Sequence, residues 1–65
     1  MASYVFSNST GAIVGTLIFS NTLDAAKVVP ANTPAGCTAT EVPDGSPALA
    51  KPLAHKIVAG KVAVV

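Results

Sequence analysis

A single cysteine, Cys37, is the feature that most limits how this 65-residue chain can fold. A chain of this length buries only about 60% of its unfolded surface, so small domains commonly add disulfides, a metal ion or oligomerisation. One cysteine cannot form an internal disulfide. A single histidine, a single cysteine and three separated carboxylates argue against a metal site, and we expect no cofactor. Contacts with copies of itself or with a larger partner remain as the expected source of additional stability.

The composition also indicates a subunit with a covered apolar surface. Hydrophobic residues make up 51% of the chain and charged residues only 11%, well below the roughly 25% of charged residues usual in globular domains. The apolar residues are mostly alanine and valine, which suit strand surfaces packed against neighbours. An isolated monomer with this composition is expected to expose sticky patches.

The charge pattern argues against several classes of partner. The net charge is +1, with four dispersed lysines and no arginine, which does not suit a nucleic-acid surface. The longest apolar stretch, residues 12–19, is far shorter than the roughly 20 residues of a membrane span. The first residues have no basic region followed by an apolar segment, so we expect no secretory signal and synthesis in a cytoplasm.

Residues 1–20 predict a β-hairpin. Strand-forming residues flank the turn sequence Asn-Ser-Thr-Gly at positions 8–11. A four-residue loop there pairs Phe6 with Ile13 and Tyr4 with Gly15, which places an aromatic ring across from a strand glycine. In this register Ile13, Leu17 and Phe19 share a face with Tyr4 and Phe6, and that face is the predicted core.

Residues 21–36 are expected to form a short helix and a loop. Asn21 or Thr22 could cap a helical turn over residues 23–27. The alternative is a third strand that ends at Val28 and Val29. The sequence PANTPAG that follows is typical of a loop.

The next two segments are a strand and an arm. Residues 37–42, CTATEV, alternate as a short half-exposed strand does. Residues 43–53 begin with the turn sequence Pro-Asp-Gly and contain two further prolines. Because proline cannot donate to a sheet ladder, we expect this segment to be an extended, irregular arm that lies against a partner.

Residues 54–65 predict a second hairpin with Ala59 and Gly60 as its two-residue turn. Val58 then opposes Lys61, Ile57 opposes Val62, and His55 opposes Val64, so that the apolar run at residues 62–65 gains a partner within the chain. The face with Ile57 and Val62 must pack on the first hairpin or on a neighbouring subunit, because an isolated hairpin is marginally stable. The whole pattern predicts one mainly β domain, residues 1–65, in which two hairpins and a short middle strand form a small sheet, sandwich or barrel with a proline-rich extended arm.

The residues that could carry chemistry are better explained structurally. Cys37 and His55 could in principle form a nucleophile–base pair, but a lone cysteine in a strand and a lone histidine at a strand start are usually structural. The carboxylates Asp24, Glu41 and Asp44 are expected in turns or at solvated positions, and a chain this small leaves little room for a catalytic cleft. We therefore expect no catalytic residues. The spacing of Gly11 and Gly15 is interpreted as a turn glycine and a strand glycine.

The order of three segments resembles small structural proteins of bacteriophage particles. These segments are STGAIVGT at 9–16, ANTPAGCTATEV at 31–42 and HKIVAGKVAVV at 55–65. The resemblance implies a non-enzymatic virion component, made in the bacterial host cytoplasm, that acts as a capsid decoration or cement protein or is associated with the tail. It implies larger virion proteins and copies of the chain itself as partners, and neither nucleic acid nor membrane.

The exposed halves of the hairpins and the proline-rich arm are the expected contact surface. A cement protein stabilises an assembly by burying apolar strand surface between larger subunits. Two other classes stay open: a small phage-encoded binding module that acts on a host protein, and a small enzyme that depends on His55 or Cys37. The predicted interface consists of Val14, Thr16, Ile18, Pro47, Leu49, Pro52, Leu53, Val58, Ala63 and Val65.

Overall fold

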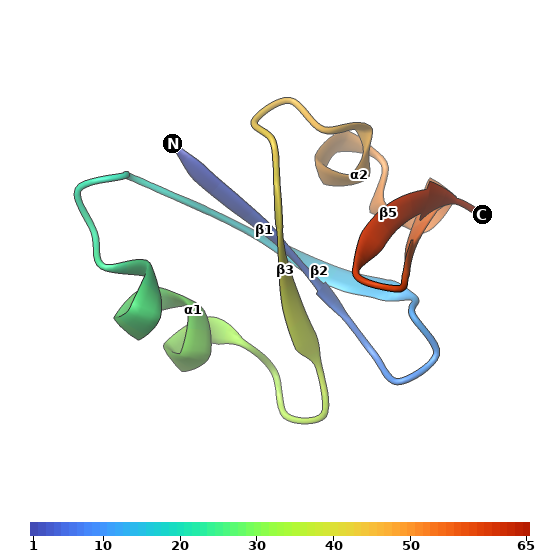
Figure 1. Cartoon of the computed structure of the whole chain (residues 1–65), viewed down its shortest axis with the longest axis horizontal. Helices are drawn as coiled ribbons and strands as arrows, with labels where there is room; N and C mark the ends of the chain where they lie inside the picture. Colours follow the sequence, from blue (N-terminus) through green and yellow to red (C-terminus); the bar gives the residue numbers. More distant parts are fainter.

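The computed structural model describes all 65 residues, and the chain is mainly β, as the sequence predicts (Figure 1). Three helical segments interrupt the strands. In chain order the elements are β1 (Ala2–Ser7), β2 (Ile13–Phe19), α1 (Ala25–Asn32), β3 (Thr38–Val42), α2 (Pro47–Ala50), the 3-10 turn η1 (Pro52–Ala54), β4 (His55–Val58) and β5 (Lys61–Val64).

The strands form two antiparallel sheets joined at one point. Sheet A has the order β2-β1-β3 and sheet B is the β4–β5 hairpin. The amide of Ile57 donates to the carbonyl oxygen of Gly11 at 2.8 Å, and Ala12 forms an isolated bridge with Lys56. In Figure 1, sheet B and α2 lie together to one side of the crossing strands of sheet A, and α1 lies on the opposite side.

The first hairpin forms as predicted, but its register differs by two residues. Phe6, not Tyr4, lies opposite Gly15, and Tyr4 pairs with Leu17. A Cβ atom added at Gly15 would lie 3.4 Å from the Phe6 ring, so the expected aromatic–glycine pair exists with a different aromatic residue. The loop is longer than predicted because the Asn8 side chain organises it. Its Oδ1 accepts from the amide and hydroxyl of Thr10 and from the amide of Ala12.

The predicted core face is wrong for Ile13 because a bulge interrupts the β1–β2 ladder. The register shifts between Phe6 and Ser7, so that Ser7 pairs with Ile13 and Val14 is the extra residue. Ile13 therefore lies on the face of Val5, not on the face of Phe6. The face predicted as the core does bury Phe6 and Phe19, and the rings of Tyr4 and Phe19 stack at 5.8 Å. The largest packed cluster, however, lies on the other face.

That cluster fills the space between sheet A, α2 and sheet B. Val5 and Ala48 are fully buried, and Ile13 and Val42 are each only 5% exposed. The half-buried side chains of Leu49, Ile57 and Val62 pack around these four residues. The apolar face of the second hairpin thus sits on the sheet of the first hairpin, which is one of the two arrangements that the sequence allowed.

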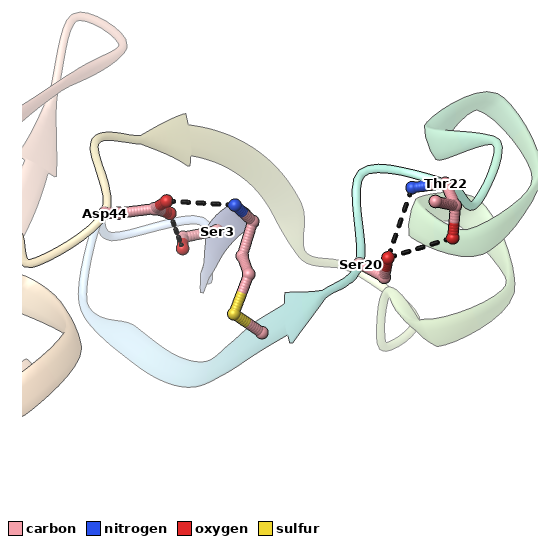
Figure 2. Close-up of polar contacts among 5 residues, drawn as sticks. Ser3, Ser20, Thr22 and Asp44 are labelled. Carbon is pink, nitrogen blue, oxygen red and sulfur yellow. Dashed lines mark hydrogen bonds and ion pairs between the residues drawn. The ribbon is translucent and has the colours of Figure 1, made fainter.

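Residues 21–36 contain a helix, not a third strand, and the helix is shifted from its predicted position. Asp24 caps it by accepting from the amide of Ala26 at 3.0 Å. Thr22, one of the two predicted caps, belongs instead to a turn in which its amide and hydroxyl contact the hydroxyl of Ser20 (Figure 2).

Helix α1 also continues through a proline that was expected to start a loop. Pro30 lacks an amide proton and leaves one helical carbonyl without its usual partner. The side chains of Asn32 and Thr33 donate to the carbonyl oxygens of Val28 and Val29 at 2.8 and 2.6 Å, which helps to close the last turn. No helix of the structure is both long enough and apolar enough to cross a membrane.

The proline-rich segment 43–53 is not an extended arm. It forms a turn at residues 43–46, the short helix α2 and the start of η1. Pro47 and Pro52 each occupy the start of a helical turn, where the missing amide has no helical partner to lose. The Ser46 hydroxyl caps α2 by accepting from the amide of Ala48. The segment folds onto the core of its own chain because Ala48 supplies a fully buried side chain.

The second hairpin has the predicted register at every position. His55 pairs with Val64, Ile57 with Val62, and Val58 with Lys61. Ala59 and Gly60 both have positive φ angles, of 52° and 79°, as the two-residue turn requires. The alternation therefore puts Lys56 and Lys61 on the outer face and Ile57 and Val62 on the inner one.

Candidate interaction surface

The predicted contact residues of the first hairpin are exposed along β2. Val14 and Ile18 expose 54% and 51% of their surface, and Thr16 between them is also exposed. β2 is an edge strand of sheet A, so these side chains lie at the border of the sheet. This strand offers an apolar strip that the chain itself leaves uncovered.

The predicted contact residues of the second hairpin lie on its outer face. Val58 is exposed and pairs with Lys61, while Ala63 is half-buried and pairs with Lys56. The outer face therefore mixes apolar side chains with two lysines. It is less apolar than the strip on β2.

A hollow between η1 and the start of β2 brings together three other predicted residues. Pro52, Leu53 and Val65 line it, and its volume is about 310 Å³. Leu53 is the most exposed large apolar residue of the chain, at 90%. The amide of Val65 donates to the carbonyl oxygen of Ala54 at 3.0 Å and so fixes the last residue beside η1. The remaining lining residues of this Leu53 hollow are Thr10, Ala12, Ile13, His55 and Lys56.

The two predicted contact residues on α2 do not join this hollow. Leu49 packs against the core cluster of its own chain, and Pro47 is exposed at the start of the helix. The structure thus divides the predicted interface into the β2 strip, the outer face of the second hairpin and the Leu53 hollow.

A polar cluster that the sequence did not predict joins the first residues to the turn after β3. The Ser3 hydroxyl donates to Asp44 Oδ1 at 2.7 Å, and the amine of Met1 lies 3.2 Å from Asp44 Oδ2 (Figure 2). Ser3 is only 2% exposed. More than forty residues separate these partners in the chain, so no local spacing signals the contact.

These hydrogen bonds favour the ionised form of Asp44. The bond from Ser3, and secondarily that from the Met1 amine, lowers the pKa of Asp44 from its ordinary value of 3.8. A carboxylate held in its ionised form does not serve as a general acid near neutral pH. We therefore assign this cluster to holding the chain together, although it borders an open hollow of about 420 Å³ that Glu41 also lines.

The two candidate reactive side chains have separate surroundings. His55 Nδ1 lies 2.9 Å from the carbonyl oxygen of Lys51, and it donates there in the tautomer that carries the proton on Nδ1. Cys37 is a free, half-buried thiol just before β3. No hydrogen bond joins the two side chains, and no group of three or more histidine, cysteine or carboxylate side chains is placed to hold a metal ion.

A third hollow, of about 340 Å³, lies beside β3 and the first hairpin loop. Hydroxyl and amide groups dominate its lining, and none of its residues titrates near neutral pH. It can offer hydrogen bonds to a neighbouring chain but no acid or base. Its lining residues are Ser7, Asn8, Ser9, Thr10, Gly11, Thr38, Thr40, Ile57 and Gly60.

Comparison of the chain with protein-family models, with curated proteins and with solved structures finds no match.

Proposed function

We propose that this chain is a non-enzymatic structural subunit of a bacteriophage particle. It stabilises the capsid or the tail by burying apolar β surface between larger subunits, as a decoration or cement protein does. Its partners are larger virion proteins and further copies of itself.

The balance between buried and exposed apolar side chains carries this proposal. Only six apolar residues are buried, whereas eight large ones are at least half exposed. Full burial of a fully exposed side chain of this kind contributes roughly 1.5–3 kcal/mol, and a half-exposed one contributes roughly half as much. The free chain therefore leaves eight large apolar side chains at least half in water, and a partner surface would gain from covering those of the predicted interface. The exposed set is Met1, Val14, Ile18, Leu23, Leu53, Val58, Val64 and Val65.

The resemblance of three segments to small phage structural proteins directs the proposal to the virion. Those segments contain Val14 and Thr16 of the β2 strip, all of β3 and the second hairpin, and these strands border solvent. The small size also suits a repeated assembly, in which weak contacts are multiplied by symmetry.

Mass spectrometry of purified particles, from a phage that encodes the chain, tests the proposal. We expect the chain in fixed stoichiometry: hundreds of copies indicate capsid decoration, and a few to some dozens indicate the tail. The Leu53→Ser variant should be lost from particles. The Leu23→Ser variant is a matched control, because Leu23 is 52% exposed but lies outside the predicted interface.

Absence of the chain from particles, together with a well-folded monomer in sedimentation experiments, would overturn the proposal. That result would favour the alternative, a small phage-encoded binding module that acts on a host protein.

A further inference from the structure

Three strands of this chain have an edge without a backbone partner. β2 and β3 each pair only with β1, and β5 pairs only with β4. The outer edge of β4 is occupied by its bridge to Ala12. Unpaired strand edges are templates for pairing with another chain, so the three free edges are compared by the groups that they present.

The free edge of β2 presents unpaired backbone groups. The amide of Asn8 donates across the first loop to Ala12, so alternation along β1 turns the even-numbered residues of that strand toward β2. Their partners are the odd-numbered residues of β2 from 15 to 19, which therefore face β1. The amide and carbonyl groups of Thr16 and Ile18 point outward, and none of the backbone hydrogen bonds outside the strand ladders reaches them.

β2 is also the free edge with the most apolar side chains. It contains neither a charged residue nor a proline, and Ile18 is 51% exposed. β3 offers the exposed Glu41 and, apart from its buried Val42, only small side chains, and β5 begins with the exposed Lys61. Charged side chains protect an edge against pairing, so β2 is the edge at which a partner strand gains most.

The regular part of β2 comprises residues 15–19. Before it, a bulge at Val14 interrupts the ladder and sheet B occupies the edge at Ala12. After it, the chain turns away, and the amide of Leu23 donates to the carbonyl oxygen of Ser20. An antiparallel copy of this strand would therefore leave the edge before it reaches sheet B.

We propose that two copies of the chain pair antiparallel through the regular part of β2, about a two-fold axis at Leu17. Thr16 of each copy then opposes Ile18 of the other, and Gly15 opposes Phe19. The two three-stranded sheets become one six-stranded sheet in which β2 is no longer a border strand. This inference rests on the proposed structural role and names the contact between copies.

The symmetry of this edge identifies a second copy as its occupant. Thr16 and Ile18 lie at equal distances on either side of Leu17, so the outward backbone groups of one copy meet those of the other. The two Thr16–Ile18 pairs each exchange two hydrogen bonds, which uses the unpaired groups on both sides. Because β2 is uncharged, self-pairing brings no like charges together.

The side chains also fit this register. On the core side, Thr16 lies beside Ile18 of the second copy, and on the other face the two Leu17 side chains meet. Gly15 leaves room for the Phe19 ring of the second copy, as it does for an aromatic ring of its own chain.

The two neighbouring registers use irregular residues. A two-fold axis at Thr16 would place Val14, the bulge residue, in the ladder. An axis at Ile18 would place Ser20, which lies in the turn after β2, opposite Thr16. The axis at Leu17 is the one that keeps the ladder within the regular part of β2.

The size of the contact predicts a weak dimer. Five residues at about 3.4 Å each extend over only about 17 Å. Such a contact is smaller than the roughly 800 Å² per partner of a typical stable complex. Repetition of the contact in a particle would strengthen it, and covalent trapping measures it in the isolated protein.

Disulfide trapping at the two-fold axis tests the pairing. The variant is Cys37→Ser with Leu17→Cys, so that position 17 carries the only thiol. The two copies of residue 17 form a pair without hydrogen bonds, with Cα atoms about 4.5 Å apart, which a disulfide can span. Under mild oxidation, mass spectrometry should show rapid formation of the 17–17 disulfide.

The matched control is Cys37→Ser with Ala39→Cys. Ala39 is half-buried like Leu17 and lies on the same face of sheet A, but on the opposite border strand. In the proposed dimer five strand spacings, or about 24 Å, separate the two copies of residue 39. We expect the 17–17 disulfide to form at least roughly tenfold faster than the 39–39 disulfide. Circular dichroism of each reduced variant checks that it is folded.

Mixed disulfides test the register. Thr16→Cys and Ile18→Cys, each with Cys37→Ser, are mixed in equal amounts. The direct pair 16–18 is about 5.5 Å apart between Cα atoms, whereas the diagonal self-pairs are about 7–8 Å apart, beyond the usual range of a disulfide. The 16–18 disulfide should form at least roughly fivefold faster than either self-disulfide.

A lysine on the edge tests the contact without altering the core. Thr16→Lys, added to the Leu17→Cys variant, places two like charges close to the two-fold axis and should slow trapping roughly tenfold. Thr38→Lys adds the same charge at an exposed threonine on the same face of the other border strand. It should leave the rate unchanged.

Equal rates for the 17–17 and 39–39 disulfides, or a self-disulfide at 16 or 18 that forms as fast as 16–18, would overturn the inference. So would equal effects of Thr16→Lys and Thr38→Lys. These measurements use the isolated protein in solution. Their failure is therefore distinguishable from failure of the virion role, which is measured by the content of purified particles.

Discussion

The two hairpins of this chain have the same plan but are held in register by different means. The β4–β5 hairpin follows from its two-residue turn, in which Ala59 and Gly60 both adopt positive φ, and its register matches the sequence prediction throughout. The β1–β2 hairpin has a longer loop arranged around the Asn8 side chain and a bulge at Val14. Its register differs from the sequence prediction. A tight turn leaves one way to align two strands, whereas a longer loop leaves several.

The hairpins also differ in how deeply they are buried. β1 lies at the centre of sheet A and contains four buried residues, two of them serines. Neither β4 nor β5 contains a buried residue, although Ile57 and Val62 are half-buried against the core. Sheet A therefore holds most of the stability, and the second hairpin depends on its attachment to it.

The largest effect is expected where the two hairpins join. A Cβ atom at Gly11 would lie 2.5 Å from the carbonyl oxygen of Ile57, and its φ of +88° disfavours any other residue. Gly11→Ala should lower the free energy of unfolding by roughly 2–4 kcal/mol through the clash and the backbone strain together. Hydrogen exchange should show that the Ile57 amide loses protection first.

Gly36→Ala is the matched control for this change. Gly36 has a similar φ of +78°, but nothing lies within 4 Å of its added Cβ atom. Gly36→Ala should lower the free energy of unfolding only by the backbone strain, about 1–2 kcal/mol. Equal losses in the two variants, in chemical denaturation, would show that the contact with Ile57 is unimportant.

Truncation of a core side chain should have the next largest effect on stability, and the loss should differ between the two hairpins. Val5→Ala removes two methyl groups from a fully buried side chain and should cost roughly 2–3 kcal/mol. Val62→Ala removes the same groups from a half-buried position in β5 and should cost about 1 kcal/mol. Urea unfolding monitored by tyrosine fluorescence or circular dichroism measures both, and a larger loss for Val62→Ala would reverse our ranking of the hairpins.

A smaller, stabilising change is available in the second turn. Ala59 is the only residue other than glycine with a positive φ. Ala59→Asn should raise the free energy of unfolding by about 0.5–1 kcal/mol, because asparagine tolerates this conformation and Asn-Gly favours the turn. Ala54→Asn provides a control at an exposed position without positive φ, and thermal unfolding would show whether only the turn variant gains stability.

The smallest effect on stability is expected from Asp44, and it should appear only in acid. Because the pKa of Asp44 is lowered in the folded chain, its contribution to stability is present above the ordinary value of 3.8 and is lost as the pH falls through the lowered pKa. Ser3→Ala removes the main cause, so the pKa of Asp44 should rise toward its ordinary value in an NMR titration. Ser7→Ala, also buried but without contact to Asp44, should leave this pKa unchanged.

Local signals account for the parts of the fold that were predicted. The alternation of residues 54–65 and the Ala-Gly turn predict the second hairpin and the exposed side of Val58. The strand at residues 37–42 and the glycine turns also follow from short-range patterns. The predictions are wrong where one residue type fits two roles: Pro47 starts a helix in the segment 43–53 and does not break it, and Asp24, not Asn21 or Thr22, caps α1.

Only part of the candidate surface could be predicted from local sequence patterns. The predicted exposure of Val14 and Ile18 is confirmed. The predicted face is wrong for Ile18, because it pairs with Ser3 and lies on the core side of sheet A. The Leu53 hollow and the Asp44 cluster combine segments that are distant in the chain, so no spacing within one segment could predict them.

The sequence by itself determined that strands form within residues 1–20, 37–42 and 54–65 and how the second hairpin aligns, because turn conformation and alternation act over a few residues. Only the tertiary structure decided which face of sheet A carries the core, since the bulge at Val14 rotates Ile13 toward Val5 and lets Ala48 close the cluster. That choice depends on how distant side chains fill one common volume. Such packing is a property of the whole chain and not of any segment within it.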